Sequence, residues 1–515
     1  MTVAVALASL CGCAFPIWAR MEPEADATTD MFTETSGSSS ASSEATAATG
    51  GGDSTGGVET GVETTGDATP SCDPVMISAG TRHTCALLGD ASVRCWGYDD
   101  GSGRLGYPGE TQIGGSAGLE LASVGPVALP GALVGAPRLL TAGPQHSCVA
   151  TDADEVVCWG RDRFVGGGGD AGAPVAPADA PVLTLPGKVI SLHAGNEFTC
   201  AELSTDAGEE VRCWGVGHRG ELGNGGTENV LDIRSAPPPP VLLGETSEVY
   251  ALAVGAYHAC ASLEENGAFM MCWGSATESL HGVYYEDEQD AQAVPTPQLV
   301  ALDGLLGDVF VDQLVAGRRH TCAFDSKERV RCWGAREYLG DNGLYAPELR
   351  VPFEADGPAV LVELDGALAL PRPLTAGPQH TCVIYDDNSI RCWGDGSHRE
   401  LGFWVCSGDL DEDCVYGDDE DEPIVVDKSV LCFRHPASYT GPCASTPTQE
   451  RLRPRALALG ERHSCALLER YEDDALRTTV RCWGENQKGE LGYPEDGPHA
   501  AVDAEDLEFQ CDASR

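Results

Sequence analysis

Basic residues are scarce in this sequence. Its 515 residues include 32 Lys and Arg against 80 Asp and Glu, so the formal net charge is -48. A protein with this excess of negative charge is repelled by nucleic-acid backbones and by anionic membrane surfaces. We therefore expect no nucleic-acid partner, while the length is sufficient for a hydrophobic core that folds alone.

Two signatures of common catalytic and metal sites are also missing. The chain has no H-E-x-x-H motif and no G-x-x-x-x-G-K-[ST] phosphate loop, so neither a zinc peptidase nor a P-loop enzyme has support. It has 22 cysteines but no C-x-x-C pair of the kind that holds zinc. So many cysteines without metal-ligand spacing favour an oxidising compartment over the cytosol. We expect no cofactor and no catalytic residues.

The main feature of the chain is a repeated motif that ends in C-W-G. The first copy begins at Ala79-Gly80, continues to His83 and Cys85, and ends at Cys95-Trp96-Gly97. Seven copies supply the tryptophans Trp96, Trp159, Trp214, Trp273, Trp333, Trp393 and Trp483. Six copies contain the histidine, as His83, His146, His258, His320, His380 and His463. The repeats indicate one repeat architecture rather than several separate domains.

Each copy predicts a β-hairpin, because two segments of alternating pattern flank a polar turn such as residues 89–92. A blade of a few antiparallel strands cannot bury both of its faces alone, whereas seven blades packed in a ring can. We therefore predict an all-β, seven-bladed β-propeller over residues 72–511, with an insertion at about 403–450 between copies six and seven. Gly97 and its equivalents are expected at sharp turns, and G-x-L-G segments such as 103–106 supply a second turn.

The pattern A-G-x-x-H-[ST]-x-A-L, followed by V-x-x-W-G and G-x-L-G, resembles the regulator of chromosome condensation repeat family. The resemblance covers residues 72–511 and implies a seven-bladed propeller. Phe198 stands where the pattern has His, and no clear G-x-L-G follows Trp159. The fourth and fifth copies have partial forms at residues 280–282 and 339–340, and the paired cysteines depart from the family's usual cytosolic pattern.

Known members of this family suggest activities by analogy. The name-giving member is a guanine-nucleotide exchange factor bound to chromatin, a plant member senses ultraviolet-B light through Trp, and a secreted member inhibits beta-lactamases through one face. Nucleotide exchange stays a remote alternative here, because export, negative charge and disulfides all argue against it.

The two cysteines of each copy predict one disulfide per blade, because facing positions of a hairpin lie within reach of a disulfide. Each bridge is expected to add about 2–3 kcal/mol of stability. The predicted pairs are Cys85–Cys95, Cys148–Cys158, Cys200–Cys213, Cys260–Cys272, Cys322–Cys332, Cys382–Cys392 and Cys465–Cys482.

Six further cysteines follow the leader. Cys72 and Cys511 flank the repeats, and a bridge between them would join the two ends of the ring. The others are in the insertion, where the simplest of three possible schemes pairs Cys406 with Cys414 and Cys432 with Cys443.

The recurring histidines and tryptophans are expected to be structural. Radial repeats place equivalent residues in separate blades, whereas a metal or catalytic site needs side chains that converge. We expect each His to hydrogen-bond backbone inside its own blade and each Trp to pack in a blade core. The alternatives are a ring of metal ligands, a set of catalytic bases or a light-sensing group of tryptophans.

The first 20 residues resemble an export leader. An apolar run at residues 3–10 precedes Cys11-Gly12-Cys13, which is similar to the lipobox of bacterial lipoproteins and would make Cys13 the lipidated residue. The run is shorter than the roughly 20 residues of a membrane span, and no basic segment precedes it. An ordinary secretory signal, a start upstream of Met1 and a chance apolar run are the alternatives. Residues 21–71 are rich in Ser, Thr, Gly and acids, which predicts a disordered tether.

The insertion contains a dense acidic run. Its residues Asp409, Asp411, Asp413, Asp418 and Asp419 form a weak candidate calcium loop. The run lacks the D-x-[DN]-x-[DN]-G spacing, so a solvated acidic loop is the expectation and a basic partner is a third possibility.

These observations predict an exported, monomeric propeller that binds an unidentified protein or glycan without catalysis. A lipid anchor would be its sole membrane contact and would hold it in the outer membrane, the periplasm or at the cell surface; otherwise it is secreted. The alternative is an extracellular polymer-degrading hydrolase or lyase that uses loop carboxylates. A cleft carboxyl with a raised pKa beside exposed aromatic residues would favour the enzyme.

Overall fold

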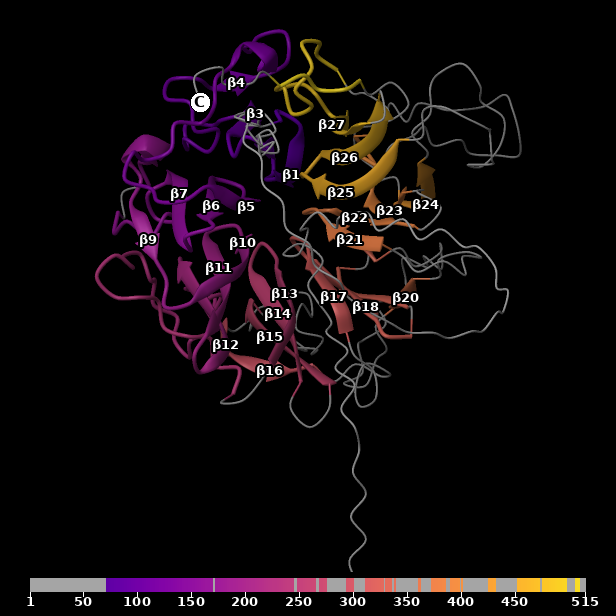
Figure 1. Ribbon diagram of the computed structural model, residues 1–515. Coiled ribbons are helices and arrows are strands. Elements are labelled where there is room, and N and C mark those ends of the chain that lie inside the picture. The colour runs from indigo at the N-terminus through magenta and orange to yellow at the C-terminus, as the bar shows by residue number, and fades with distance from the viewer. Residues whose placement is uncertain are drawn as a thin grey trace, which may run out of the picture.

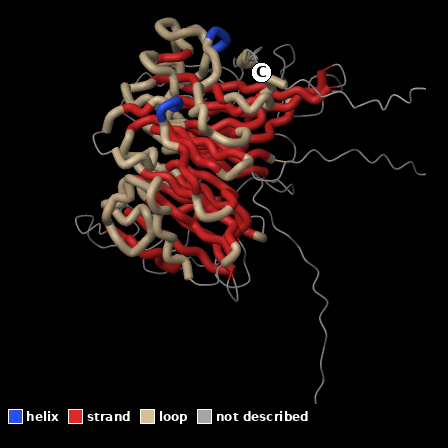
Figure 2. The backbone as a smooth tube through the Cα atoms, turned by 60° about the vertical axis from the view of Figure 1, so that its left-hand side comes forward, coloured by secondary structure: helices blue, strands red, loops and turns tan. Residues whose placement is uncertain are grey.

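Seven antiparallel sheets surround a common axis (Figure 1). Strands make up most of the regular backbone, and the described helical segments are two short 3-10 turns, η1 (Leu121–Ser123) and η2 (Pro177–Asp179) (Figure 2). The prediction of an all-β, seven-bladed propeller is confirmed. The computed structural model describes residues 71–169, 172–244, 248–264, 268–275, 293–300, 311–327, 329–335, 338–339, 360–362, 372–385, 390–398, 400–401, 425–431, 452–472, 475–497 and 505–509.

Each sheet is one blade whose strands follow one another in chain order. Blade one contains β1 (Pro74–Ala79), β2 (His83–Leu88), β3 (Val93–Tyr98) and β4 (Gln112–Ile113). Blade two contains β5 (Pro137–Ala142), β6 (His146–Thr151), β7 (Glu155–Arg161), β8 (Pro174–Val175) and β9 (Val182–Thr184), and blade three contains β10 (Lys188–Ala194), β11 (Phe198–Thr205) and β12 (Gly208–Gly215).

The later blades repeat this order. Blade four contains β13 (Glu248–Val254), β14 (His258–Glu264), β15 (Ala268–Ser275) and β16 (Ala293–Leu299). Blade five contains β17 (Val311–Ala316), β18 (His320–Asp325), β19 (Val330–Gly334) and β20 (Val360–Val362). Blade six contains β21 (Arg372–Ala376), β22 (His380–Ile384), β23 (Ile390–Asp395) and β24 (Val425–Leu431), and blade seven contains β25 (Arg453–Leu459), β26 (His463–Glu472) and β27 (Ala475–Gly484).

The first strand of every blade lies innermost, around the axis (Figure 1). In all seven blades its register with the second strand shifts by one residue, which is a β-bulge. A bulge leaves one residue unpaired and redirects its side chain. The bulged residues are Val75, Arg138, Ile190, Tyr250, Asp312, Pro373 and Arg455.

The second and third strands form the hairpins that the sequence predicts. Their registers place the two cysteines of each repeat directly opposite each other, with Cα atoms 4.0–4.1 Å apart. All seven predicted hairpin disulfides are present, one in each blade. Each bridge closes its hairpin near the middle of the blade, where both sulfur atoms are fully buried.

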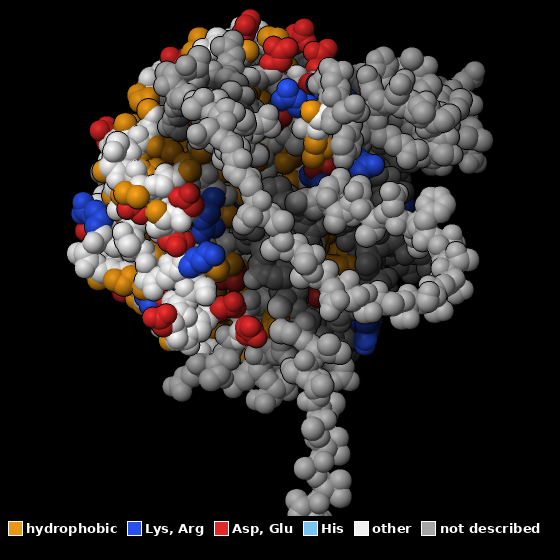
Figure 3. All heavy atoms as spheres, viewed as in Figure 1, with side chains coloured by type: hydrophobic (Ala, Val, Ile, Leu, Met, Phe, Trp, Pro, Cys, Tyr) orange, Lys and Arg blue, Asp and Glu red, His pale blue; other side chains and the backbone are white. Residues whose placement is uncertain are grey.

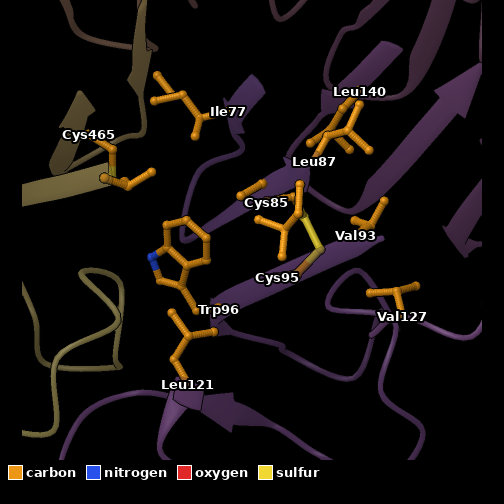
Figure 4. Packing of buried hydrophobic residues seen from close by; sticks show 14 of the residues in the cluster. Ile77, Cys85, Leu87, Val93, Cys95, Trp96, Leu121, Val127, Leu140 and Cys465 are labelled. Carbon is orange, nitrogen blue, oxygen red and sulfur yellow. A yellow bond between two sulfur atoms is a disulfide. The ribbon is translucent and has the colours of Figure 1, made fainter. Parts of the chain in front are cut away.

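The motif tryptophans fill the core between blades. All seven are 0% exposed. Trp96 extends from β3 toward Cys465 of β26, so its indole lies between blades one and seven (Figure 4). Trp214 likewise packs with Leu139 and Val156 of blade two. The expectation of a core role is confirmed, and the structure adds that this core is shared with the preceding blade.

Blades one and seven close the ring. Thr478 on β27 donates a hydrogen bond to the Pro74 carbonyl at 2.5 Å, and Arg477 pairs with Asp73 at 3.3 Å. The segment 505–509 follows β27, where the Leu507 amide donates to the Val480 carbonyl at 2.9 Å. The ends of the repeat region therefore meet at one junction.

Several predictions fall outside the described residues. These are the leader with Cys13, the tether to residue 70, the candidate calcium aspartates and the four insertion cysteines. Cys72 is disulfide-bonded, but its predicted partner Cys511 lies outside the described residues too, so that pairing remains a prediction. Part of the insertion is described: β24 pairs with β23 as the outer strand of blade six. Among the described helical segments, none has the length and apolar character to cross a membrane.

Candidate functional site in the central channel

All seven blades converge on the propeller axis, where two cavities lie. The larger, of about 290 Å³, is lined by the innermost strands. The smaller, of about 210 Å³, is lined by the turns that follow these strands. We call the whole passage the central channel. Because repeated elements meet only at the axis, a site built by several blades belongs here.

Glycines allow the turns around the smaller cavity to approach one another. A Cβ atom added to the first glycine of a repeat would lie less than 3.0 Å from the carbonyl oxygen of the matching glycine in the next blade. This holds for Gly80, Gly143, Gly195, Gly255, Gly317 and Gly377. The glycine of each C-W-G motif has φ between 106° and 119°, which confirms the expected sharp turn.

The recurring histidines connect neighbouring blades. Nε2 of each His lies 2.7–2.9 Å from the Ser or Thr hydroxyl of the next blade, in a pair that we call an interblade latch. The last pair joins blade seven to blade one. The six pairs are His83–Ser147, His146–Thr199, His258–Thr321, His320–Thr381, His380–Ser464 and His463–Thr84.

The prediction of a backbone bond inside each blade is therefore wrong for these histidines. Successive side chains of a strand point to opposite faces. In β2, His83 therefore faces blade two, while the adjacent Thr84 faces blade seven and receives His463. A single hairpin thus carries one half of each of two latches.

Burial lowers the pKa of five latch histidines, so these rings are neutral near pH 7. Ser464 donates its hydroxyl proton to the Glu400 carbonyl at 2.7 Å, so His380 must donate its Nε2 proton to Ser464. Burial favours the uncharged ring and lowers the pKa of His146, His320 and His463 to about 4. Burial also lowers the pKa of His380, to about 3, and the neighbouring His463 and His320 contribute.

The junction between blades three and four has no such latch. Phe198 occupies the histidine position of blade three, and Ala259 occupies the hydroxyl position of blade four. Both are 0% exposed and share one apolar cluster. Ala259 is the one residue without a hydroxyl in the Ser/Thr position of the seven copies, and this was the sequence signal for the exchange.

The G-x-L-G segments also join blades. The carbonyl before the leucine accepts a hydrogen bond from the tryptophan Nε1 of the next blade, in the pairs Trp159–Arg104, Trp273–Glu221 and Trp483–Glu400 at 2.8–3.0 Å. The side chain of Glu400 accepts the His398 amide at 2.7 Å, and burial raises the pKa of Glu400 to about 8. The buried Glu400 side chain therefore stabilises the turn at His398.

Blade three places three polar side chains on the wall of the larger cavity. Ser191 and His193 are on β10, and Glu202 faces Ser191 across the register from β11. The Ser191 hydroxyl donates to Glu202 Oε2 at 2.8 Å, and His193 Nε2 donates to Ser191 Oγ at 3.0 Å. Burial raises the pKa of Glu202 to about 7 and lowers that of His193 to about 4. The cluster therefore holds a carboxyl that gains or loses its proton near neutral pH.

The two ends of the propeller differ in charge. Antiparallel strands place successive turns at opposite ends of a blade. The turns between first and second strands, which we call the turn face, contain Arg82, Arg318, Arg319 and Arg462 against Glu197 and Glu461. At the other end, the hairpin turns of blades one to three and the strand residues beside them carry seven acids and no Lys or Arg, whereas the hairpin turn of blade five has Lys327 and Arg329. The seven acids, within residues 89–92, 152–155 and 206–210, are Asp90, Asp152, Asp154, Glu155, Asp206, Glu209 and Glu210.

An aromatic residue accompanies the arginines of the turn face. The Arg219 guanidinium lies 4.2 Å from the centre of the Tyr257 ring, which is a cation–π distance. Arg318 pairs with Glu461 of blade seven at 3.8 Å. On the described part of the face seen in Figure 3, acidic, basic and apolar side chains are interspersed. The turn face thus carries four arginines, and one of them, Arg318, lines the smaller cavity.

Comparisons with known proteins agree with this architecture. Residues 76–104 and 374–400 match the family model described as "Regulator of chromosome condensation (RCC1) repeat". Protein pim1 of Schizosaccharomyces pombe is 26% identical over 362 residues, which cover 67% of this chain and 62% of pim1. The ultraviolet-B receptor UVR8 of Arabidopsis thaliana is 23% identical over 386 residues, which cover 64% of this chain and 78% of the receptor. These findings support membership of the RCC1 repeat family.

A solved structure shows the same fold as this chain. Human WBSCR16 superposes with a TM-score of 0.53 and 17% identity, covering 80% of this chain and 94% of that protein. The chain spans less than two thirds of the length of pim1. RCC1-like propellers act in protein interaction or regulation.

The structure distinguishes residues that hold the repeats together from residues that are candidates for function. The motif Trp, His and Cys residues belong to blade cores and junctions. In the described part of the chain, no group of three or more His, Cys, Asp or Glu side chains could hold a metal. Sequence reasoning missed Glu202, although it stands where the other copies have Leu87, Ala150, Ser262, Phe324, Ile384 and Leu467.

Sequence reasoning also passed over a G-x-S-x-G pattern at residues 114–118, a pattern typical of serine hydrolases. Its Ser116 is exposed and donates its hydroxyl to the Asp496 carboxylate, while the Ser116 amide contacts the same carboxylate at 2.8 Å. The segment follows strand β4 and leads into further turns instead of a helix. It therefore lacks the strand-turn-helix geometry of a nucleophile elbow.

Proposed function

We propose that this protein is an exported, non-catalytic interaction propeller that binds a protein partner with an acidic surface through its turn face. The observation that carries the proposal is the excess of arginine there, on a chain with 80 acidic and only 32 basic residues. Arg82, Arg318, Arg319 and Arg462 come from three blades, and Arg219 with Tyr257 adds a stacking surface. Arginine and aromatic residues are enriched among the residues that dominate binding energy.

The rigidity of the ring supports a binding role. Six interblade latches, seven disulfides and close glycine contacts hold the turns in fixed positions. A preformed surface loses little conformational entropy when a partner binds. Arg318 pairs with Glu461 at 3.8 Å and Arg462 pairs with Glu485 at 3.2 Å, so a carboxylate of the partner would join or replace these ion pairs.

The test is binding of a fluorescent oligoglutamate peptide, followed by anisotropy at 50 and 200 mM salt. We expect the affinity to weaken with salt. In the triple variant R82A/R318A/R319A it should fall about tenfold, which corresponds to a loss of about 1.4 kcal/mol of binding free energy. The control is R234A, which removes an exposed arginine in a local ion pair with Asp232. Equal affinity of the triple variant and the control would overturn the turn face as the site, and selective binding of an acidic glycan would favour the glycan partner.

Export and anchoring form a separate part of the proposal. The disulfide in every blade suits an oxidising compartment, and Cys13 would carry the lipid. Expression of the full chain in a bacterial host, followed by membrane fractionation, tests this directly. We expect the wild type in the membrane fraction and C13S in the soluble fraction; equal distribution of the two would contradict lipidation at Cys13.

Glu202 is the observation that favours a second candidate function, that of an extracellular polymer-degrading enzyme. Its raised pKa in a cavity is the property expected of a general acid, and Tyr250 lines the same cavity. Glycoside hydrolysis needs two carboxyl groups on either side of the scissile bond. The hydrogen-bonded neighbours of Glu202 are Ser191 and, through it, His193. Polysaccharide hydrolysis that the wild type performs and E202Q loses would establish the enzyme instead.

A further inference from the structure

Blade three departs from the other blades at the channel wall. Its innermost strand has Ser191 and His193 where β5 has Leu139 and Thr141. Its second strand has Glu202 where four of the other copies have Leu, Ile or Phe. No other copy has an ionisable residue at this position, so a buried carboxyl here has no role in the blade that the other blades share. Such departures occur where a function demands them.

The larger cavity is electrostatically suited to a cation. Its lining includes Glu202 and Asp312 but no Lys or Arg among the described residues. Glu202 is 4% exposed. The groups that act on it are the Ser191 hydroxyl and the acidic Glu209, so no positive charge compensates its carboxylate. A buried carboxylate without a counter-charge is unstable, and a bound cation would supply the missing charge.

The rest of the lining is apolar and partly aromatic. Leu139, Ile190, Leu192 and Tyr250 lie around the cluster, and Tyr250 is the bulged residue of the adjacent blade. An aromatic face attracts ammonium groups, and the aliphatic side chains suit an apolar substituent. A cavity of about 290 Å³ is at the small end of the range for ligand sites.

We propose that the central channel binds a small organic cation, an amine with an apolar substituent, whose ammonium group pairs with the Glu202 carboxylate. Ser191 holds that carboxylate from one side through its 2.8 Å hydrogen bond, and His193 orients Ser191. The ligand's apolar part contacts the strands of blades two to four. This site lies inside the channel and is independent of protein binding at the turn face.

The proposal predicts coupling between ligand and proton. Glu202 has a pKa of about 7 when the cavity is empty, so part of the population must lose a proton before the ammonium group binds. Affinity should rise from pH 5.5 to pH 8.5 by at least tenfold. Binding at pH 7 should release a fraction of a proton into the buffer.

The experiment is isothermal titration calorimetry of the full, disulfide-bonded chain with benzylammonium as the probe. Titrations at pH 7 in two buffers with different ionisation enthalpies measure the protons released. We expect benzylammonium to bind, benzyl alcohol to bind at least tenfold more weakly, and E202Q to lose both the affinity and the proton release. E110Q, which changes an exposed glutamate outside the channel, is the matched control and should equal the wild type.

Two results would overturn the proposal. Equal binding of benzylammonium and benzyl alcohol would show that the cavity is merely apolar. Equal binding by wild type and E202Q would show that the charge of Glu202 plays no part. E202Q removes a buried charge and keeps the shape of the side chain, so it should fold, and its circular dichroism confirms that before titration. Because the turn-face arginines are unchanged in E202Q, its oligoglutamate binding reports separately on the proposed function.

Discussion

The junction between blades three and four solves the packing problem differently from the other six. Six junctions bury a neutral His against a hydroxyl, whereas this one buries Phe198 against Ala259. Both members of the pair are exchanged together. A lone Phe would leave a buried hydroxyl without its histidine partner, and a lone Ala would leave a buried imidazole without an acceptor. The comparison teaches that a latch is a two-residue unit, although its halves lie in different repeats.

Blade three also differs in how it responds to pH. The latches contain buried histidines with a lowered pKa, so a fall in pH destabilises the folded protein at these junctions. Burial raises the pKa of Glu202, so a rise in pH destabilises the folded protein at this carboxyl group. The two regions should therefore respond to pH with opposite sign, and mutations that exchange their features can separate the two effects.

The largest expected effect is acid destabilisation of the latched junctions. Burial lowers the pKa of His146, His320 and His463 to about 4 in the folded protein, whereas the ordinary value in the unfolded chain is near 6.5. The unfolded state therefore binds more protons between these values, and the stability present above pH 6.5 is lost as the pH falls toward 4. At pH 4, one such histidine lowers the free energy of unfolding by about 3 kcal/mol relative to its value above pH 6.5. Urea unfolding at pH 7 and pH 4 should show this loss.

Replacing one latch by the apolar pair measures the pH effect of one histidine separately from that of the many acidic residues. H146F/T199A copies the Phe198–Ala259 pair into the junction of blades two and three. Its loss of stability between pH 7 and pH 4 should be smaller than that of the wild type by about 3 kcal/mol. An unchanged pH dependence would show that His146 does not titrate with unfolding.

Breaking a latch on one side should be the next largest effect. H146F alone leaves the Thr199 hydroxyl buried without its partner, which costs about 2–3 kcal/mol of the free energy of unfolding. In the double variant H146F/T199A, the second substitution should recover most of the lost free energy of unfolding at pH 7. Denaturant unfolding of both single variants and the double variant gives the coupling energy, and a value near zero would contradict the two-residue unit.

Neutralising the buried acid of blade three should stabilise the protein. The pKa of Glu202 is raised to about 7 on folding, so the folded state holds a proton that the unfolded state loses between pH 4.5 and 7. The contribution of Glu202 to stability is therefore highest below pH 4.5 and falls as the pH rises to 7. E202Q should gain about 1–2 kcal/mol at pH 8 and nothing at pH 4.5. A gain of equal size at both pH values would indicate a packing effect instead.

The smallest expected effect is the addition of a seventh latch. F198H/A259T should build the pair seen at the other junctions and change stability at pH 7 by about +1 kcal/mol at most, since a net hydrogen bond contributes that much. F198H alone should destabilise the protein, because Ala259 offers no acceptor. Thermal unfolding at pH 7 compares the two variants with the wild type, and a double variant less stable than F198H would rule out the geometry.

The central polar cluster shows why part of the site was beyond prediction. The hairpin cysteines are separated by 10 residues in blades one and two, so spacing alone places them face to face. Glu202 and Ser191 also lie on adjacent strands of one blade. Their significance depends on the cavity, which arises only when seven blades close around the axis. A sequence pattern records neither the cavity nor the burial that raises the pKa of Glu202.

The sequence by itself determined the number of blades, the hairpins and their disulfides, since these depend on periodicity and on contacts between residues close in the chain. Only the tertiary structure decided what the histidines bind. His463 and Thr84 are 379 positions apart, and their 2.8 Å contact exists because the last blade meets the first. The same closure places the tryptophans between blades and turns the glycines toward one another. Long-range contacts of this kind follow from the ring, which no single repeat contains.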